Sequence, residues 1–592
     1  MQVEQKLQNS IYEALDKLYG SSIKKEHIQV QRTRKEFDGD FTVVVFPFLK
    51  ISKKSPEQTA TEIGQYVLDN VEIIDSFNVI KGFLNIGFSH QFWIEWFKEL
   101  KDPELQLKGL VESKSIMVEY SSPNTNKPLH LGHIRNNLLG YSVSEILKAM
   151  GHQVYKTQII NDRGIHICKS MLAWQLFGNG ETPQSSGLKG DKLVGKYYVE
   201  FDKHYKNEIA ELVTAGKSEE DAKKEAPLLV QAQQMLLKWE AKDPKVIGLW
   251  ETMNGWVYDG FDTTYKNLGV DFDKLYYESV TYLYGKQKVL EGLEKGIFYQ
   301  KEDGSVWCDL TEFKLDHKLL LRSDGTSVYI TQDIGTALMR LEDYPELNQL
   351  IYTVGNEQDY HFQVLFAILS KLGYDWAKNC YHLSYGMVDL PTGKMKSREG
   401  TVVDADDLVS DMYLKAKETT TELGKLEDVP ESEKETLFHE IGLAGLKYFI
   451  LKVDPKKRMM FNPEESIDFN GNTGPFIQYT HARISAILNR SKSGSPDYTS
   501  KINIQSKELD VIRQLYFFPA VMEAAAENYS PAEIASYVYD LVKIYNSFYQ
   551  SIKIFDVDNN EITAFRVELS KKVGKTIAYG LQLLGISAPN QM

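Results

Sequence analysis

The stretch that decides the fold runs from Ser115 to Met150, SIMVEYSSPNTNKPLHLGHIRNNLLGYSVSEILKAM. It opens with a short apolar run, Ile116 to Val118, and continues through a loop rich in serine, proline and asparagine. It then becomes periodic, with apolar residues three and four positions apart. A strand, a loop and a helix are therefore predicted in that order, as in the first half of a parallel α/β fold.

The loop enters the helix through His130-Leu131-Gly132-His133. The first turn of a helix presents unpaired backbone N–H groups and the positive end of the helix dipole, which together attract anions. Gly132 has no side chain, so a flat base or a ribose can lie against the backbone, and both histidines can donate hydrogen bonds to phosphate oxygens. The motif predicts a phosphate site without a Walker lysine. The alternative is two surface histidines that cap an ordinary helix.

The H-x-G-H motif, preceded by Ser122-Pro123-Asn124 and Lys127-Pro128-Leu129, resembles the first signature of class I aminoacyl-tRNA synthetases, and arginyl-tRNA synthetases in particular. The resemblance implies a Rossmann-like α/β catalytic domain with a helical insertion, a small α/β N-terminal domain and an all-helical C-terminal anticodon-binding bundle. It also implies that His130 and His133 are catalytic and that His130, Gly132 and His133 bind ATP.

Four domains are expected along the 592 residues. The first is a small α/β module which, by resemblance, touches the tRNA elbow; the second is catalytic, the third carries a signature loop and connecting helices, and the fourth binds the anticodon. Their expected bounds are 1–110, 111–385 with a helical insertion from about 170 to 300, 386–460, and 461–592. After the insertion, strands are expected to resume only at Ser305-Val306-Trp307.

The first domain contains three local signals. An apolar run predicts a strand from Phe41 to Phe48. Ser55-Pro56-Glu57-Gln58 is a capping box with proline at the first helical position, which predicts the start of a helix. The segment from Phe77 to Phe88, broken at Lys81-Gly82, predicts a hairpin.

Leu319 to Ile330 predicts a strand, a turn and a second strand that runs into a helix, with Tyr329 and Asp333 at the junction. Such junctions face the edge of the sheet where ligands bind. A guanidinium is planar and permanently charged, and a carboxylate with coplanar acceptors recognises it best. Asp333 supplies the carboxylate, and Tyr329 supplies a hydroxyl. The alternative is that Asp333 only satisfies backbone donors at a helix N-terminus.

The resemblance implies further contacts to arginine. Glu119 would be a second acid, and His133 would touch both arginine and ATP. Gln358 would be a neutral partner; it lies in the first turn of the helix that follows a buried strand at Leu350 to Val354. A buried acid left unpaired by a wrong side chain costs several kcal/mol, so no editing domain is required. The complete predicted arginine-binding set is Glu119, Ser122, Pro123, Asn124, His133, Tyr329, Asp333 and Gln358.

A third constellation is the basic, glycine-bounded loop GKMKSREG, residues 393–400, which can close over a triphosphate. It resembles the K-M-S-K-S loop of class I enzymes, but Ser397 stands where the second lysine belongs. Arginyl synthetases commonly carry a lysine just upstream of H-x-G-H instead, which Lys127 matches. Lys127, assisted by Lys394, Lys396 and Arg398, is therefore the predicted catalytic cation, and Lys394 and Met395 are predicted to contact ATP. The alternative is a catalytically weak loop.

After about residue 440 the pattern is helical, and NTGPFIQYTHARI, residues 472–484, resembles the start of the anticodon-binding bundle of arginyl synthetases. Polar and aromatic side chains on such a surface can stack unpaired bases and read their edges. The alternative is that the aromatic side chains belong to a core. The predicted tRNA-binding residues are Asn472, Gln478, Tyr479 and Arg483.

The net charge of −14 argues at first against a nucleic-acid partner, but this objection is limited, because binding depends on the local field rather than on the total charge. Three cysteines lie far apart without zinc spacing, so no structural metal is expected. No apolar run approaches the roughly 20 residues of a membrane span, and the first residues lack a signal-peptide pattern, so a cytoplasmic protein is expected.

The predicted function is activation of L-arginine with ATP, with Mg²⁺ bound to the ATP, followed by transfer of the arginyl group to the 3′ end of tRNA(Arg). A monomer is expected from the family habit alone. Three alternatives are a class I synthetase for another amino acid, a tRNA-binding homologue without catalysis, and a small nucleotidyltransferase that uses the same histidine motif. The paired carboxylates of Glu119 and Asp333 favour arginine over acidic or apolar amino acids.

Overall fold

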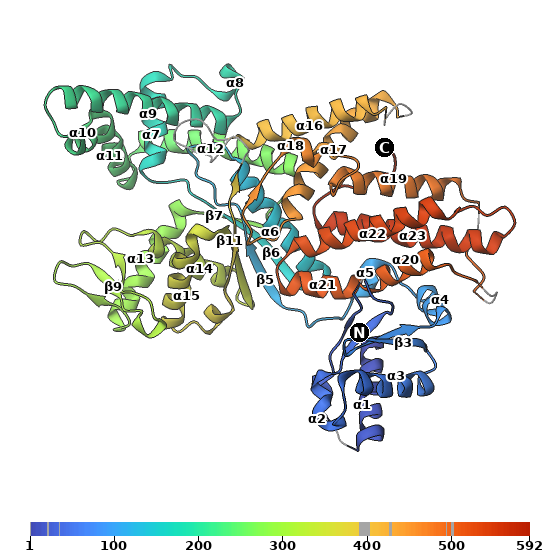
Figure 1. The fold of residues 1–592 in the computed structure, drawn as a ribbon. Helices are drawn as coiled ribbons and strands as arrows, with labels where there is room; N and C mark the ends of the chain where they lie inside the picture. The colour runs from blue at the N-terminus through green and yellow to red at the C-terminus, as the bar shows by residue number, and fades with distance from the viewer. Residues whose placement is uncertain are drawn as a thin grey trace. The chain divides into compact units, whose positions relative to one another are not determined.

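The structure, a computed structural model, describes residues 2–20, 23–34, 36–389, 403–424, 429–492, 494–498 and 502–592. These residues form two compact units. The first comprises residues 1–106, 483–521 and 539–577, and the second comprises residues 107–482, 522–538 and 578–592. Figure 1 draws the elements of both units. No helix among the described residues is long and apolar enough to cross a membrane.

The first unit contains an antiparallel sheet of four strands in the order β1-β2-β4-β3, with helices packed against it. Five helices, α5, α19, α21, α22 and α23, have residues in both units. The bounds are α1 (Gln2–Tyr19), β1 (Val30–Arg32), β2 (Phe41–Val44), α2 (Leu49–Ser52), α3 (Pro56–Asn70), β3 (Ile74–Ile80), β4 (Phe83–Phe88), α4 (His90–Lys98), α5 (Pro103–Leu107), α20 (Ser506–Tyr516), α19 (Gly474–Arg490), α21 (Phe518–Glu527), α22 (Pro531–Ser551) and α23 (Asn560–Leu583).

Two local predictions in this unit are confirmed. Ser55 caps α3, and its hydroxyl accepts a hydrogen bond from the backbone N–H of Gln58 at 3.2 Å. β3 and β4 form the predicted hairpin, and the turn residues Lys81 and Gly82 have φ angles of 50° and 77°. The strand predicted from Phe41 to Phe48 is wrong in length, because a 3-10 turn at Phe46–Phe48 follows β2 and carries Pro47.

A buried ion pair joins β2 to α20 within the first unit. Asp40, just before β2, is 5% exposed, pairs with Arg513 of α20 and accepts a hydrogen bond from the backbone N–H of Phe88 at 2.6 Å. Burial raises the pKa of Asp40, and the Arg513 guanidinium opposes that shift. The buried carboxylate therefore accepts hydrogen bonds from Phe88 and, at 3.4 Å, from Nε1 of Trp93, and it pairs with a partly exposed Arg513.

Replacing Asp40 with alanine is expected to lower the free energy of unfolding by about 3 kcal/mol, because Arg513 and the Phe88 N–H lose their buried acceptor. Urea denaturation followed by circular dichroism measures the change. Lys54→Ala is the control, since it breaks an exposed ion pair with Glu62 and should cost less than about 1 kcal/mol. Equal losses in the two variants would contradict the role given to Asp40.

The second unit is built around a parallel sheet of five strands in the order β12-β11-β5-β6-β7. β5 is fully buried, as the continuous apolar run predicted, because helices cover the sheet. Figure 1 shows the strands at the centre of this unit with α13, α14 and α15 beside them. The bounds are β5 (Ser115–Glu119), β6 (Gln153–Ile160), β7 (Lys274–Tyr277), β11 (Gln349–Gly355) and β12 (Tyr381–Tyr385).

Six helices lie between β6 and β7 and form the helical insertion, which Figure 1 shows as a body that extends away from the sheet. The prediction that strands resume only at Ser305 is wrong, since β7 already pairs with β6 at Lys274–Tyr277. The helices are α7 (Ile165–Phe177), α8 (Pro183–Ser186), α9 (Gly190–Thr214), α10 (Glu219–Glu225), α11 (Pro227–Glu240) and α12 (Pro244–Leu268).

The remaining elements of the second unit include a small antiparallel sheet, β10-β9-β8, and a two-stranded parallel pair, β13-β14. The second strand predicted before Ile330 is wrong: only a single bridge joins Leu321 to Ser327, and α14 begins at Tyr329. The bounds are α6 (Leu131–Ala149), α13 (Glu278–Glu294), β8 (Tyr299–Gln300), β9 (Val306–Cys308), β10 (Lys318–Leu321), α14 (Tyr329–Asp343), α15 (Asp359–Lys371), β13 (Val388–Asp389), α16 (Ala405–Glu422), α17 (Glu431–Leu451), β14 (Met459–Met460) and α18 (Pro463–Ser466).

A close crossing of two helices brings acidic side chains together at one edge of the sheet. A Cβ atom added to Gly285 of α13 would lie 1.9 Å from the backbone oxygen of Thr331 in α14, and one added to Gly335 of α14 would lie 2.4 Å from the oxygen of Thr281. Only glycine permits this approach of two backbones. Because the contact lies near the first turns of both helices, their N-terminal residues are held in fixed relative positions.

Candidate active site

His130 and His133 cap the helix that follows the predicted phosphate loop. His130 is the N-cap of α6, and its Nδ1 accepts a hydrogen bond from the backbone N–H of Gly132 at 3.2 Å. The Nδ1 of His133 accepts from the backbone N–H of His130 at 3.2 Å. The two rings lie with their centroids 4.0 Å apart. Both side chains are half-buried and cap α6, so the alternative interpretation is confirmed in the capping and wrong only in placing the histidines on the surface.

The protonation of these rings follows from the same contacts. Burial, with a smaller contribution from Lys127, lowers the pKa of His130 to about 4, and burial holds the pKa of His133 well below its ordinary value. Both imidazoles are therefore neutral near pH 7. Since each Nδ1 accepts from the backbone, the single ring proton resides on Nε2. Each histidine presents one N–H donor, which suits phosphate oxygens.

The second turn of α6 is anchored to the sheet and to a neighbouring loop. Asn136 donates from its amide to the backbone oxygen of Thr353 in β11 at 2.6 Å and accepts from the backbone N–H of Ser121 at 2.5 Å. Arg135 is fully buried and donates to the backbone oxygen of Lys457 at 2.8 Å. These contacts fix the direction in which the histidines point.

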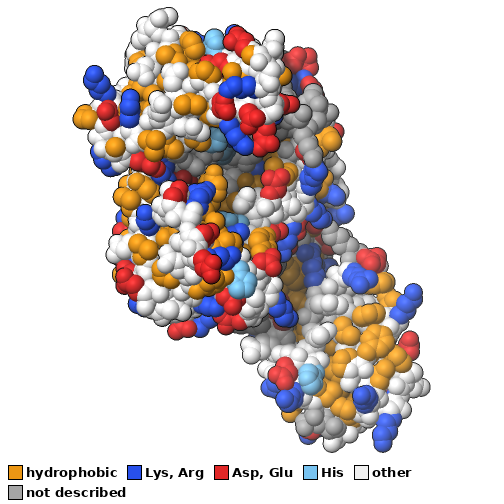
Figure 2. All heavy atoms as spheres, turned by 90° about the vertical axis from the view of Figure 1, so that its left-hand side faces the viewer, with side chains coloured by type: hydrophobic (Ala, Val, Ile, Leu, Met, Phe, Trp, Pro, Cys, Tyr) orange, Lys and Arg blue, Asp and Glu red, His pale blue; other side chains and the backbone are white. Residues whose placement is uncertain are grey.

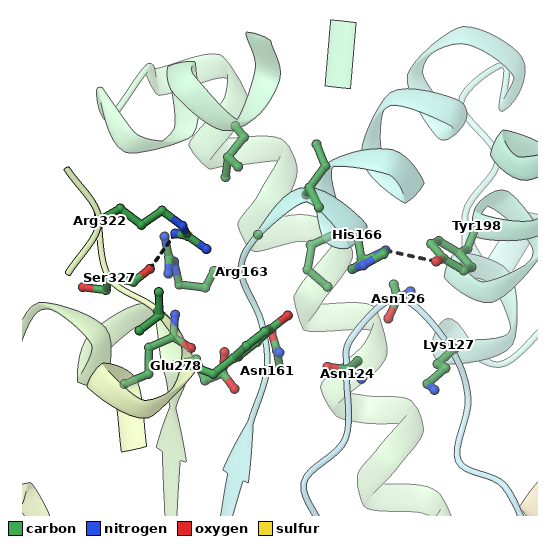
Figure 3. A pocket seen from close by; sticks show the side chains of 17 residues that line it. Asn124, Asn126, Lys127, Asn161, Arg163, His166, Tyr198, Glu278, Arg322 and Ser327 are labelled. Carbon is green, nitrogen blue, oxygen red and sulfur yellow. Dashed lines mark hydrogen bonds between the residues drawn. The ribbon is translucent and has the colours of Figure 1, made fainter. Parts of the chain in front are cut away.

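A cavity of about 610 Å³ is lined by Asn124, Asn126 and Lys127 of the loop that leads to this motif, whereas His130, Gly132 and His133 do not line it. Figure 3 shows Arg322, Arg163 and Glu278 on one side of it and Lys127 and Tyr198 on the other. Among the predicted residues, Asn124, Lys127 and Tyr329 line the cavity. The other polar residues of its wall, which the sequence did not indicate, are Asn126, Asn161, Arg163, His166, Tyr198, Glu278, Arg322, Ser327 and Gln332.

Glu278 is the acid of this cavity. It is the first residue of α13, and burial together with the charges of Asp333 and Asp162 raises its pKa to about 8. A carboxyl group with such a pKa is mostly protonated at pH 7 unless a cation approaches it. The sequence signal for Glu278 was available but weak: it directly follows β7, the strand that the periodicity missed.

Asp333, the predicted partner of a guanidinium, lies in the first half of α14. Its side chain is 44% exposed, and its Oδ2 lies 2.6 Å from Nε2 of His361 in α15. Tyr329 begins α14 and is 72% exposed, so its hydroxyl is free to meet a ligand. Gln358 is exposed and ends the 3-10 turn just before α15. Asp333 does not line the cavity itself but influences it through its charge on Glu278.

Glu119, the second predicted acid, is buried, unlike Asp333. It is 5% exposed at the end of β5 and forms an ion pair with Arg340 of α14, which is fully buried. Burial raises the pKa of Glu119, and the Arg340 guanidinium opposes that shift. The carboxylate is thus already bound to a guanidinium of the chain itself, a partner that the sequence did not reveal.

The loop between β5 and α6 continues the sheet beyond its last paired strand residues. Thr125 donates its backbone N–H to the oxygen of Asn161 at 3.0 Å, and Asn161 donates to the oxygen of Pro123 at 2.9 Å. Pro123 is buried and Ser122 is exposed. Asn124 therefore sits opposite Asn161, and both reach the cavity.

Lys127 lines the large cavity and also a neighbouring one of about 230 Å³ that includes His130 and Asp404. Burial lowers the pKa of Lys127 because its ammonium form is poorly solvated there, and an anion that approached it would stabilise that charged form. Lys394, Met395, Lys396 and Arg398 lie outside the described residues.

The residues predicted to bind tRNA have contacts of their own. Gln478 has no exposed area and donates to the backbone oxygen of Ser587 at 2.9 Å, so it holds the end of the chain. Asn472 is exposed and accepts from the hydroxyl of Tyr448 at 2.6 Å, and Tyr479 is half-buried. Arg483 donates to the Oδ1 of Asn546 at 2.9 Å.

No extended basic surface is visible on the face drawn in Figure 2, where acidic and basic side chains are mixed. Among the described residues, no group of three histidine, cysteine or acidic side chains is arranged to hold a metal ion.

The parallel sheet, the capping histidines and the long insertion after the second strand define a class I aminoacyl-tRNA synthetase. The catalytic-domain model of class I tRNA synthetases (R) matches residues 99–462, the DALR anticodon binding domain matches residues 477–592, and the arginyl tRNA synthetase N terminal domain matches residues 5–88. The chain belongs to the arginyl-tRNA synthetase family.

Curated relatives and solved structures agree with that assignment. The chain is 59% identical to an arginine–tRNA ligase of Flavobacterium psychrophilum and 57% identical to one of Bacteroides fragilis, in each case with 100% of both chains covered. Its fold matches that of the Thermus thermophilus arginyl-tRNA synthetase with a TM-score of 0.77 at 23% identity, over 100% of both chains. These matches confirm the predicted fold class and family.

Proposed function

We propose that the protein is an arginine–tRNA ligase, which activates L-arginine with ATP to arginyl-adenylate and pyrophosphate, and then transfers the arginyl group to the 3′ end of tRNA(Arg) with release of AMP. The observation that carries the proposal is the identity of 55–59% with curated arginine–tRNA ligases over the whole of this chain and of theirs. The neutral histidine pair, together with the cavity that the preceding loop forms with Glu278, supports it.

The arginine site is proposed to combine Asp333 and Tyr329 of α14 with Glu278 and Asn124 of the cavity wall. Two carboxyl groups can engage both edges of a guanidinium, which a neutral side chain cannot reproduce. Glu119 would contribute through its remaining lone pairs while it stays paired with Arg340. Ser122, Pro123, His133 and Gln358 complete the proposed set.

The ATP phosphates are proposed to lie against the first turn of α6, over Gly132. The arginine carboxylate attacks the α-phosphorus in line, and the Nε2–H groups of His130 and His133, with Lys127, stabilise the charge that moves toward pyrophosphate. Magnesium is proposed to enter with ATP, whose phosphates supply oxygen ligands that suit it. Lys394, Met395, Lys396 and Arg398 are proposed to assist from the signature loop. No side chain is assigned as a general base.

The tRNA is proposed to contact both ends of the chain. A small cavity of about 160 Å³ in the N-terminal module contains Arg34, Lys81 and Phe37, a combination that suits a phosphate and a base. At the other end Asn472, Tyr479 and Arg483 are proposed to contact the anticodon, with Gln478 acting indirectly. The four-domain division is part of the same proposal, and the monomeric state and the cytoplasm stay predictions.

Arginine-dependent ATP–pyrophosphate exchange, with and without matching tRNA, tests the function. The expected result is exchange that requires L-arginine and is not supported by lysine or citrulline. Full activity with another amino acid would overturn the assignment to arginine. Exchange without tRNA would leave that assignment standing and contradict only the dependence on tRNA that the family resemblance implies.

Arginine binding at pH 7 is expected to release close to one proton per molecule bound. The free protein holds Glu278 mostly protonated, because its pKa is about 8, and a guanidinium favours the carboxylate. Isothermal titration in buffers of different ionisation enthalpy measures the release. Glu278→Gln should abolish it, whereas Glu346→Gln, which changes an exposed acid, should not.

The raised pKa of Glu278 also determines how its contribution to folding stability changes with pH. The pKa of Glu278 is higher in the folded than in the unfolded protein, so its contribution is fully present below about pH 4.5 and is lost as pH rises through about 8. Glu278→Gln should flatten this part of the pH dependence of unfolding in urea.

In the binding experiment, proton release that persists in Glu278→Gln would contradict the assignment of Glu278 to the arginine site.

A further inference from the structure

A buried cluster of charges joins the helical insertion to the first residues of α16. Lys189, the N-cap of α9, forms an ion pair with Asp406 of α16, and its Nζ lies 3.2 Å from Oδ2 of Asp191. It also donates to the Oγ1 of Thr264 in α12 at 2.5 Å. Thr264 donates in turn to the Oδ1 of Asp406 at 2.9 Å. Three elements far apart in the sequence therefore share one set of charges.

The cluster is shielded from solvent. The side chain of Asp191 has no exposed area, and those of Lys189 and Asp406 are each 20% exposed. Burial raises the pKa of Asp191 to about 6, and the charge of Lys189 opposes that shift. Lys189 is thus the cation that permits two carboxylates to lie close together in a poorly solvated place.

Close backbone packing fixes the position of α9. A Cβ atom added to Gly190 would lie 2.0 Å from the backbone oxygen of Trp256 in α12. One added to Gly195 would lie 2.8 Å from the Cδ of Pro128, two residues before His130. The helix that carries Lys189 therefore contacts both the rest of the insertion and the loop that enters the histidine motif.

The residues just before Asp406 are hydrogen-bonded to the histidine motif. The backbone N–H of Leu131 donates to the oxygen of Val403 at 3.2 Å, and the N–H of Ala405 donates to the oxygen of Leu129 at 2.9 Å. Asp404 caps α16 by accepting from the N–H of Asp406 at 2.8 Å. The start of α16 is thus bonded to the histidine motif on one side and to Lys189 and Lys192 on the other, since Lys192 pairs with Asp404 at 3.3 Å and with Asp407 at 2.6 Å.

We propose that Lys189 is a positioning residue for adenylate formation: through Asp406 it holds residues 403–405 against the histidine motif and so fixes the direction of the His130 Nε2–H donor. Lys189 lines neither of the two cavities beside that motif, so it acts through other residues and not on the substrates. The inference rests on the proposed function and adds a link between the insertion and the phosphate site.

Steady-state pyrophosphate exchange with tRNA present tests the proposal. Lys189→Met and Asp406→Asn are each expected to lower kcat about tenfold and to leave KM for arginine unchanged. The double variant should also lose about tenfold, not a hundredfold, because both changes break the same link. Lys189→Arg, which keeps the charge, should stay within about threefold of the wild type.

Lys223→Met is the matched control, since it removes an exposed ion pair of the same insertion and should leave kcat unchanged. Unchanged kcat in Lys189→Met, or losses that multiply in the double variant, would overturn the proposal. If Lys189→Met does not fold, Asp406→Asn and Thr264→Val decide by the same criteria. A wild-type protein without arginine-dependent exchange would refute the proposed function instead, so the two failures are distinguishable.

Discussion

Replacing His133 with alanine is expected to lower kcat of arginine-dependent pyrophosphate exchange about 100-fold, with a smaller change in KM for ATP. The imidazole is neutral, and its Nε2–H is the donor that charge developing on the phosphates would use. Losing one such donor costs on the order of 3 kcal/mol of transition-state stabilisation. Single-turnover measurement of adenylate formation separates this loss from effects on product release.

Two further variants separate catalysis from helix capping. In His133→Asn the amide oxygen can replace Nδ1 as the acceptor for the His130 N–H, but no donor reaches the position of Nε2. This variant should keep the stability of the wild type and lose activity as alanine does. In His133→Gln the amide N–H₂ can approach the position of Nε2, so part of the activity should return. Full activity in His133→Asn would show that His133 is only a cap.

The pH dependence should agree with this view. Because the pKa of His130 is about 4, its imidazole does not titrate between pH 5 and 8. Exchange activity should therefore show no inflection near the ordinary histidine value of about 6.5. If activity instead falls with the protonation of one group near pH 6.5, and that group is His130, its ring is more solvated than its burial implies.

What the sequence could predict was local. The strand, loop and helix around His130 are set by periodicity and by capping chemistry within a few residues, and the structure confirms them. The hairpin at Lys81-Gly82 is similarly local. β7 was missed because it has four residues, one of them a lysine, and so short a segment shows no clear alternation of apolar and polar residues between charged helices.

What the sequence could not predict depends on partners far along the chain. Nothing near Glu119 indicates that Arg340, in another element, pairs with it. Glu278 becomes an acid of the site only because α13 crosses α14 at Gly285 and Gly335, which brings it near Asp333. A sequence motif also does not reveal whether Gln478 is buried, as it is here, where it donates to the backbone oxygen of Ser587. The family resemblance indicated the residue types, and the packing of the structure shows which other side chains those residues contact.

Asp333→Asn is expected to lower kcat/KM for arginine about 100-fold and to leave KM for ATP nearly unchanged. The replacement keeps the size of the side chain but removes the charge, and one Oδ acceptor becomes a donor that opposes a guanidinium N–H. A charge-assisted hydrogen bond contributes about 1.5–3 kcal/mol, and the adverse donor adds to its loss. His361 also loses the carboxylate that lies 2.6 Å from its Nε2.

The matched control is Asp359→Asn in the first turn of α15, where a half-exposed carboxylate lies 3.2 Å from Nδ1 of His382. It removes an equal charge from a similar acid–histidine pair and should change kcat/KM for arginine less than about threefold. Pyrophosphate exchange at varied arginine and at varied ATP compares the two. Equal losses in both variants would mean that net charge near the sheet edge, and not a directed contact from Asp333, selects arginine. Loss confined to Asp333→Asn places the guanidinium at this carboxylate.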